Sequence, residues 1–192
     1  MNAGVKNAPV DLIHTAYSQY YLMTEIMIAM MVWIASVTGM TVPEAPPHSP
    51  VYVNERVMKY IMNGCSSEVN KETCKIILNE KNNNSVLGIF DHHTNNIYLN
   101  QSIRTLDQKI QDSILIHELV HYMQFQNNLP YTCLGELEKD AYRVQSEWLI
   151  KHGRKDVYEE LEISPLWMII ITGCADSDMI WDVPPDSEST IK

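Results

Sequence analysis

The sequence predicts a single α+β domain that is mostly helical, with a small antiparallel sheet or hairpin placed just before one long helix. Its length of 192 residues fits one ordinary domain, and 45% hydrophobic against 20% charged residues is the balance of a globular chain. Helical stretches dominate, and only residues 86–100 alternate as paired strands do. We therefore expect a helical arm over 1–40, a connector over 41–50, a core over 51–175 and an acidic tail over 176–192.

The charge of the chain argues against nucleic acid as a partner. The formal net charge is −10, and the sequence pI is about 5.1. Binding to phosphates depends on clustered Lys and Arg, whereas the 14 basic residues here are scattered. An acidic surface of this kind most often serves solubility, so it indicates no particular partner.

The N-terminal arm is expected to be one long helix or two abutting ones. Pro9 suits the first turn of a helix, and neither Pro nor Gly follows from Val10 to Thr38, so the helix should end at Gly39. Its methionine-rich second half must be buried, because methionines at helical spacing usually fill gaps in a core. The methionines concerned are Met23, Met27, Met30 and Met31.

The longest apolar stretch of the chain, Ile26–Gly39, is 14 residues long. A membrane-spanning helix needs roughly 20 apolar residues, so we expect a buried core helix and no membrane association. The only early positive charge is Lys6, and the apolar stretch starts late, which does not fit an ordinary secretory signal. These features slightly favour the cytoplasm, and they leave the oligomeric state open.

The connector after the arm contains four prolines, which block both helix and strand and predict an extended path. Val51–Val53 can then start a short strand, and Asn54 can cap a helix running to Met62. A further short helix is expected over 70–79, and the asparagine-rich stretch 79–84 is expected to be a loop.

A β-hairpin is predicted in the middle of the chain. Apolar runs at Val86–Asp91 and Asn96–Asn100 flank a polar turn at 92–95. His92 and His93 lie in this turn, where we expect them to be exposed and not to share a metal, since neighbouring residues of an extended strand face opposite ways. An edge strand beside the next helix could hold an extended peptide by main-chain hydrogen bonds.

The next helix is predicted from about Leu106 to Asn127. Thr105 can cap it, with Gln108 as the second half of a capping box, and Pro130 lies just beyond its end.

One face of this helix is apolar and ends in two histidines. Ile110, Ile114, His117 and His121 follow one another at spacings of four, three and four, so both imidazoles continue the apolar face and point inward. Buried imidazoles need partners, and a metal ion supplies them.

His117, Glu118 and His121 form an H-E-x-x-H motif. Residues four apart on a helix point the same way, so the two imidazoles can converge on one cation while Glu118 lies beside its bound water. Zinc lowers the pKa of such a water to about 7, and a neighbouring carboxylate can take the proton as hydroxide attacks a carbonyl. The motif therefore indicates a catalytic zinc site with its own general base.

A catalytic zinc site needs a third protein ligand, and the predicted helix at Gly135–Leu149 offers one. Three acidic residues of this helix are candidates: Glu136, Glu138 and Asp140. Glu138 heads a face with Ala141, Tyr142 and Gln145, and the small Ala141 would let this helix approach the metal helix closely. We prefer Glu138 to Glu136 on this ground, and both stay open.

These two helices resemble the gluzincin branch of the zinc metallopeptidases. In that branch the H-E-x-x-H motif, matched here by His117, Glu118 and His121, is followed on a second helix by a glutamate ligand. The metzincin branch is disfavoured because no H-x-x-G-x-x-H extension follows His121. The resemblance covers roughly Val86 to Leu149.

The second half of the resemblance is a looser match. Glu138 followed by Ala141 and Tyr142 resembles the E-x-x-A pattern of several small zincin-like families, some of them uncharacterised. Glu136 and Asp140 also fit a G-E-x-x-x-D pattern.

The resemblance implies a zincin-like fold and a minimal zinc metallopeptidase that acts on a peptide or protein. Zinc would be held by His117, His121 and Glu138, with Glu118 as general base and then as proton donor to the leaving amine. Tyr142 is the nearest candidate donor to the oxyanion, although a core tyrosine with a satisfied hydroxyl fits the same position. The alternative is a zincin-like domain whose retained metal site serves a structural or protein-interaction role.

The C-terminal region adds little to the predicted site. His152 is a further candidate for stabilising a transition state. Lys155–Leu161 and Pro165–Thr172 are predicted as short helices, the second apolar enough to pack on the core, and an extended acidic tail begins at Asp176.

The four cysteines form no C-x-x-C pair, so a cysteine zinc site is disfavoured, and disulfides or buried thiols are expected. Cys65 with Cys74 could close a short loop, and Cys133 with Cys174 could tie the region after the motif to the C-terminal segment.

Overall fold

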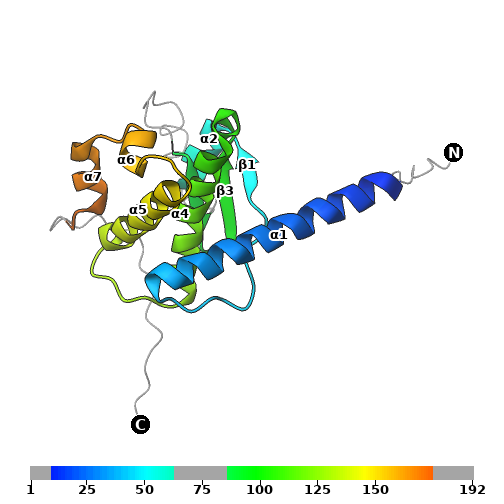
Figure 1. The fold of residues 1–192 in the computed structure, drawn as a ribbon, viewed down its shortest axis with the longest axis horizontal. Coiled ribbons are helices and arrows are strands. Elements are labelled where there is room, and N and C mark those ends of the chain that lie inside the picture. Colours follow the sequence, from blue (N-terminus) through cyan, green and yellow to red (C-terminus); the bar gives the residue numbers. More distant parts are fainter. Residues whose placement is uncertain (1–9, 63–85, 175–192) are drawn as a thin grey trace, which may run out of the picture.

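The computed structural model describes residues 10–62 and 86–174, and the expected helix at 70–79, the loop at 79–84, the Cys65–Cys74 pair and the acidic tail lie outside them. The described chain is mostly helical with a small sheet, as predicted. Its elements are α1 (Val10–Thr38), β1 (Val51–Val53), α2 (Glu55–Met62), β2 (Gly88–Asp91), β3 (Asn96–Asn100), a 3-10 turn (Gln101–Thr105), α4 (Gln108–Gln126), α5 (Leu134–Lys151), α6 (Val157–Glu160) and α7 (Pro165–Thr172). Helix α4 lies at the centre, in contact with α5, α1 and β2 (Figure 1).

Helix α1 is a single helix that ends before Gly39, as predicted. Met27, Met31 and Ile34 are fully buried in the core, so the expected role of the methionine-rich half is confirmed. Trp33 packs edge-on against Trp148 of α5, with ring centroids 5.0 Å apart. The N-terminal part of α1 extends past the rest of the domain (Figure 1).

One helix among the described residues is long and apolar enough to cross a membrane, judged by length and composition alone. The window is Tyr21–Thr38, with a mean hydropathy of 1.6 and 22% of it buried. Its buried side belongs to the core described above. Its opposite side exposes Leu22 and Val32.

Among the described residues, the sheet has three strands in the order β1-β3-β2. The predicted hairpin is confirmed, since β2 and β3 pair antiparallel with Gly88 opposite Leu99. The expectation of a purely antiparallel sheet is wrong, because β1 pairs with β3 in parallel. A parallel pair needs a long crossover, and the chain between β1 and β3 supplies it. Strand β2 is therefore an edge strand, and it lies against α4.

The hairpin turn is organised by Asp91. Its carboxylate accepts hydrogen bonds from the backbone N–H of His93 at 3.0 Å and from the Thr94 hydroxyl at 2.7 Å. Asn95 takes a left-handed φ of 57°, which asparagine tolerates. His92 and His93 are both exposed, as predicted.

The predicted capping of the motif helix by Thr105 and Gln108 is wrong. The N-cap is Asp107, whose side chain accepts from the backbone N–H of Lys109 at 2.9 Å. Thr105 instead closes the preceding 3-10 turn by donating its hydroxyl to the Ser102 carbonyl at 2.9 Å. Both residues are good N-caps, and the extra turn moves the helix start past Thr105.

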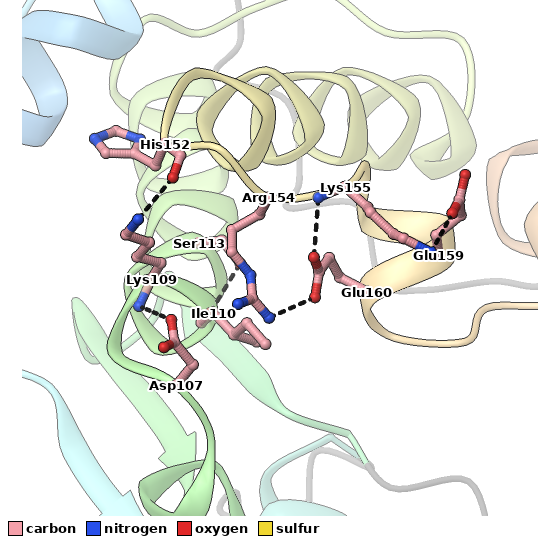
Figure 2. Close-up of polar contacts among 9 residues, drawn as sticks. All are labelled: Asp107, Lys109, Ile110, Ser113, His152, Arg154, Lys155, Glu159 and Glu160. Atoms are coloured by element: carbon pink, nitrogen blue, oxygen red, sulfur yellow. Dashed lines mark hydrogen bonds and ion pairs between the residues drawn. The ribbon is translucent and has the colours of Figure 1, made fainter.

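Figure 2 shows how the end of α5 is joined to α6. Gly153, with φ of 75°, ends α5, and the N–H of Arg154 bonds the Leu149 carbonyl at 2.9 Å. The Glu160 carboxylate then accepts from the Arg154 guanidinium at 2.8 Å and from the Lys155 backbone N–H at 2.9 Å. These bonds hold the pKa of Glu160 below its usual value.

Both short C-terminal helices are present, and the expectation that the second packs on the core is largely wrong. In α7 only Met168 is buried, while Leu166, Ile169 and Ile170 are 68%, 69% and 59% exposed. Consecutive residues of a helix spread around its axis, so an unbroken apolar run cannot turn every side chain towards one surface.

A disulfide links Cys133, at the N-cap of α5, to Cys174 just beyond α7, which confirms one of the two expected pairings. The start of α5 and the end of α7 also approach closely here, since a Cβ on Gly135 would lie 2.7 Å from the Thr172 backbone carbon. Disulfides are typical of proteins that fold in oxidising compartments, so this bond counts against the slight preference for the cytoplasm.

Reduction of this disulfide is expected to lower the free energy of unfolding by about 2–4 kcal/mol, because it releases a loop with a sequence separation of 41. The measurement is urea unfolding of the oxidised protein and of a Cys133→Ser, Cys174→Ser double variant. Equal unfolding midpoints would show that the bond does not stabilise the domain.

Candidate metal centre

The two motif histidines lie side by side on α4. Their Nε2 atoms are 3.1 Å apart, and their ring planes meet at 73°. His117 is buried and His121 is half-buried, as the apolar face of this helix predicts. The two imidazoles therefore present one nitrogen each to the same point.

Glu138 of α5 completes the cluster. Its Oε2 lies 3.3 Å from His117 Nε2, and its Oε1 lies 3.4 Å from His121 Nε2. The ligand atoms of these three residues all lie within 4.8 Å of one another. Ala141 is fully buried in the core.

The alternative ligand, Glu136, points elsewhere. It is exposed, and its Oε2 accepts a hydrogen bond from the backbone N–H of Thr132 at 2.9 Å. Of the two glutamates left open by the sequence, the fold thus brings only Glu138 to the histidines.

The cluster is compact enough to surround one metal ion. The two Nε2 atoms are 3.1 Å apart, and each lies 3.3–3.4 Å from a different oxygen of the Glu138 carboxylate. One ligand atom from each of the three residues can thus be chosen so that all lie within 4.8 Å of one another. Two imidazoles and one carboxylate are also the donor set of many catalytic zinc sites, in which the fourth position is kept for water.

The charges of the cluster are strongly coupled. Burial alone would lower the pKa of His121, but the charge of Glu138 and its hydrogen bond outweigh burial and raise this pKa to about 9. Burial alone would raise the pKa of Glu138, but the two imidazoles hold it well below its usual range. The pocket thus favours a positive charge between these side chains.

Glu118 lies at the junction of α4 and β2. It is 4% exposed, and burial raises the pKa of its carboxyl. The backbone N–H of Phe90 hydrogen-bonds this carboxylate. Gly88 lies so close that a Cβ there would clash with Glu118 Oε1 and lie 2.8 Å from its Cδ. The edge strand therefore holds the predicted base in place.

Tyr142 packs on the cluster from α5. Its ring meets the His117 ring edge-on, with centroids 4.6 Å apart at 69°. Burial, followed by the charges of Glu138 and Glu118, raises the pKa of its hydroxyl. Tyr142 therefore stays protonated and able to donate a hydrogen bond.

The remaining predicted histidine candidate does not join this cluster. His152 lies 14 positions beyond Glu138 on the same helix, about 21 Å along its axis. Its Nδ1 pairs with the Trp148 carbonyl at 2.7 Å, and its ring stacks on Trp148.

Two residues of the site carry roles that the sequence did not indicate. Gln124 contacts His121 and Gln145 contacts His117, and both glutamines are buried. The sequence places Gln145 on the same helical face as Glu138, and so near the site, but it does not indicate a contact with His117. Gly88 also gave no signal, because its closeness to Glu118 arises only when the hairpin packs on α4.

A family model described as a domain of unknown function (DUF6647) matches residues 22–182. No curated protein and no solved structure matches the chain.

Proposed function

Because this chain belongs to the DUF6647 family, whose domain has no known function, we propose a function from its own residues: a zinc-dependent metallopeptidase of the zincin type. The observation that carries the proposal is the convergence of His117, His121 and Glu138, whose ligand atoms lie within 4.8 Å of one another and form a donor set common in catalytic zinc sites. When bound, zinc would lower the pKa of a water molecule to about 7 and polarise the scissile carbonyl.

Glu118 is the general base in this proposal. It follows His117 directly in the chain, so the helix places its carboxylate at the edge of the metal cluster. Its carboxylate would take a proton from the attacking water and then deliver it to the leaving amine. The hydrogen bond from Phe90 and the contact with Gly88 would keep it oriented through both transfers.

Strand β2 would hold the substrate in this proposal. It is an edge strand, and it lies directly against the helix that carries the motif. An extended peptide could add to this edge through main-chain hydrogen bonds, which would bring a peptide carbonyl towards the cluster. Tyr142 would then donate its hydroxyl proton to the carbonyl oxygen as negative charge develops there.

A second candidate function is a zincin-like domain that works through protein interactions. The exposed apolar side chains of α7, such as Leu166 and Ile169, favour it, because large apolar side chains gathered on a surface often mark a contact with another molecule. This function needs no hydrolysis at the metal centre.

The direct test combines metal analysis with a cleavage assay. We expect purified protein to bind one equivalent of zinc and to cleave members of a diverse peptide pool, with cleavage lost on chelation and restored by zinc. Bound zinc without any cleavage would favour the second candidate. A protein that takes up no zinc would refute the proposal.

Gly88→Ala is expected to slow hydrolysis by about 10²-fold, because the new methyl group must displace the Glu118 carboxylate and a shift of about 1 Å can cost that much. Zinc affinity should stay unchanged, since the three atoms nearest to the added Cβ all belong to Glu118, which is not one of the three metal ligands. Rates on one cleaved peptide and zinc titrations check both points. Full activity in this variant would argue against Glu118 as the base.

A further inference from the structure

In a series of linked hydrogen bonds that begins at a backbone carbonyl, the donor of each bond can be assigned, because a carbonyl can only accept. On α5, the Leu137 carbonyl lies 3.0 Å from Gln124 Nε2, so this end of the Gln124 amide is the donating NH₂ group. Gln124 Oε1 therefore faces His121 Nδ1, 2.9 Å away, and must accept from it. His121 accordingly carries a proton on Nδ1.

The same reasoning applies to His117 through a longer series of hydrogen bonds. The Ser113 hydroxyl donates to the Ile110 carbonyl at 2.8 Å, a bond drawn in Figure 2. Ser113 Oγ then accepts from Gln145 Nε2 at 3.2 Å, which leaves Gln145 Oε1 to accept from His117 Nδ1 at 3.1 Å. His117 also carries its proton on Nδ1.

We propose that Gln124 and Gln145 are positioning residues that orient both histidines to bind zinc through Nε2. This inference rests on the proposed zinc site. With a proton on each Nδ1, both rings are turned so that Nε2 is the atom offered to an ion, and the two Nε2 atoms lie 3.1 Å apart. A single cation between them can therefore bind both rings. The two glutamines thus set the ring orientation that zinc binding needs.

Both orienting groups are neutral amides, whereas a carboxylate often fills this role beside zinc-bound histidines. Among the described residues, Glu138 and Glu118 are the acidic side chains that act on the two histidines. A carboxylate beside Nδ1 makes an imidazole more basic, so it neutralises more of the charge of the metal. The amides orient the rings without this effect and leave more positive charge to act on substrate.

The test measures zinc affinity by chelator competition in Gln124→Met and Gln145→Met, which keep side-chain length and remove the hydrogen bonds. Each is expected to lose about 10–100-fold in zinc affinity. Gln126→Met, at the exposed end of the same helix, is the matched control and should bind as wild type does. Gln145→Glu keeps the acceptor for His117, so it should recover most of the affinity.

A second readout distinguishes positioning from general support of the fold and uses the wild-type protein. Imidazole ¹⁵N chemical shifts of the zinc-loaded protein should show both histidines bound through Nε2 and protonated at Nδ1. Binding through Nδ1, or methionine variants as tight as wild type, would overturn this inference while leaving the zinc site intact. A wild-type protein that binds no zinc would instead overturn the proposed function, and this inference with it.

Discussion

Glu118→Gln is expected to reduce peptide hydrolysis by about 10²–10⁴-fold while the protein still binds one zinc ion. The amide has the shape of the carboxylate but cannot take a proton from water. Glu118 is not among the three side chains that converge on the ion position, so zinc affinity should change little. The measurement is the rate on a single cleaved peptide at saturating zinc, together with the zinc content of the same preparation.

A matched control for this variant is Asp112→Asn on the same helix. Asp112 accepts a hydrogen bond from Gln108 at 2.8 Å and belongs to the polar side of α4. Its neutralisation changes the charge of the helix by the same amount without touching the cluster. If both variants lost hydrolysis equally, the loss would follow from net charge, and Glu118 would not be the base.

Features set by neighbouring residues were predictable from the sequence. The long α1 follows from a stretch without Pro or Gly, and the inward direction of His117 and His121 follows from their place on an apolar helical face. The hairpin follows from two apolar runs around a polar turn. In each case the cause lies within a few residues of the feature.

Features that depend on distant contacts were not predictable. The parallel pairing of β1 with β3 joins segments separated by more than 40 positions, and no local pattern specifies it. The contact of Gln145 with His117 likewise spans 28 positions and two helices. The error at Thr105 has a different cause. Thr105 and Asp107 are both suitable N-caps, and only the 3-10 turn that ends at Thr105 moves the start of α4 to Asp107.

The choice between Glu136 and Glu138 requires both the local sequence pattern and the packing of distant segments. Both glutamates fit a family pattern, and they lie two positions apart on one helix, which turns their side chains about 200° from each other. Only the packing of α5 on α4 decides which one faces the histidines, and it selects Glu138. The choice of Glu138 as the ligand can be tested by measuring the zinc affinity of variants at both positions.

Glu138→Gln is expected to lower zinc affinity by more than the roughly 10–100-fold attributed to an orienting residue, since it removes one of three protein ligands. Glu136→Gln, which alters a bond to the Thr132 backbone, should bind zinc as wild type does. Chelator competition on both variants gives the comparison, and the electronic spectrum of bound cobalt reports the change in ligand set. The reverse order of affinities would make Glu136 the ligand and require α5 to sit differently on α4.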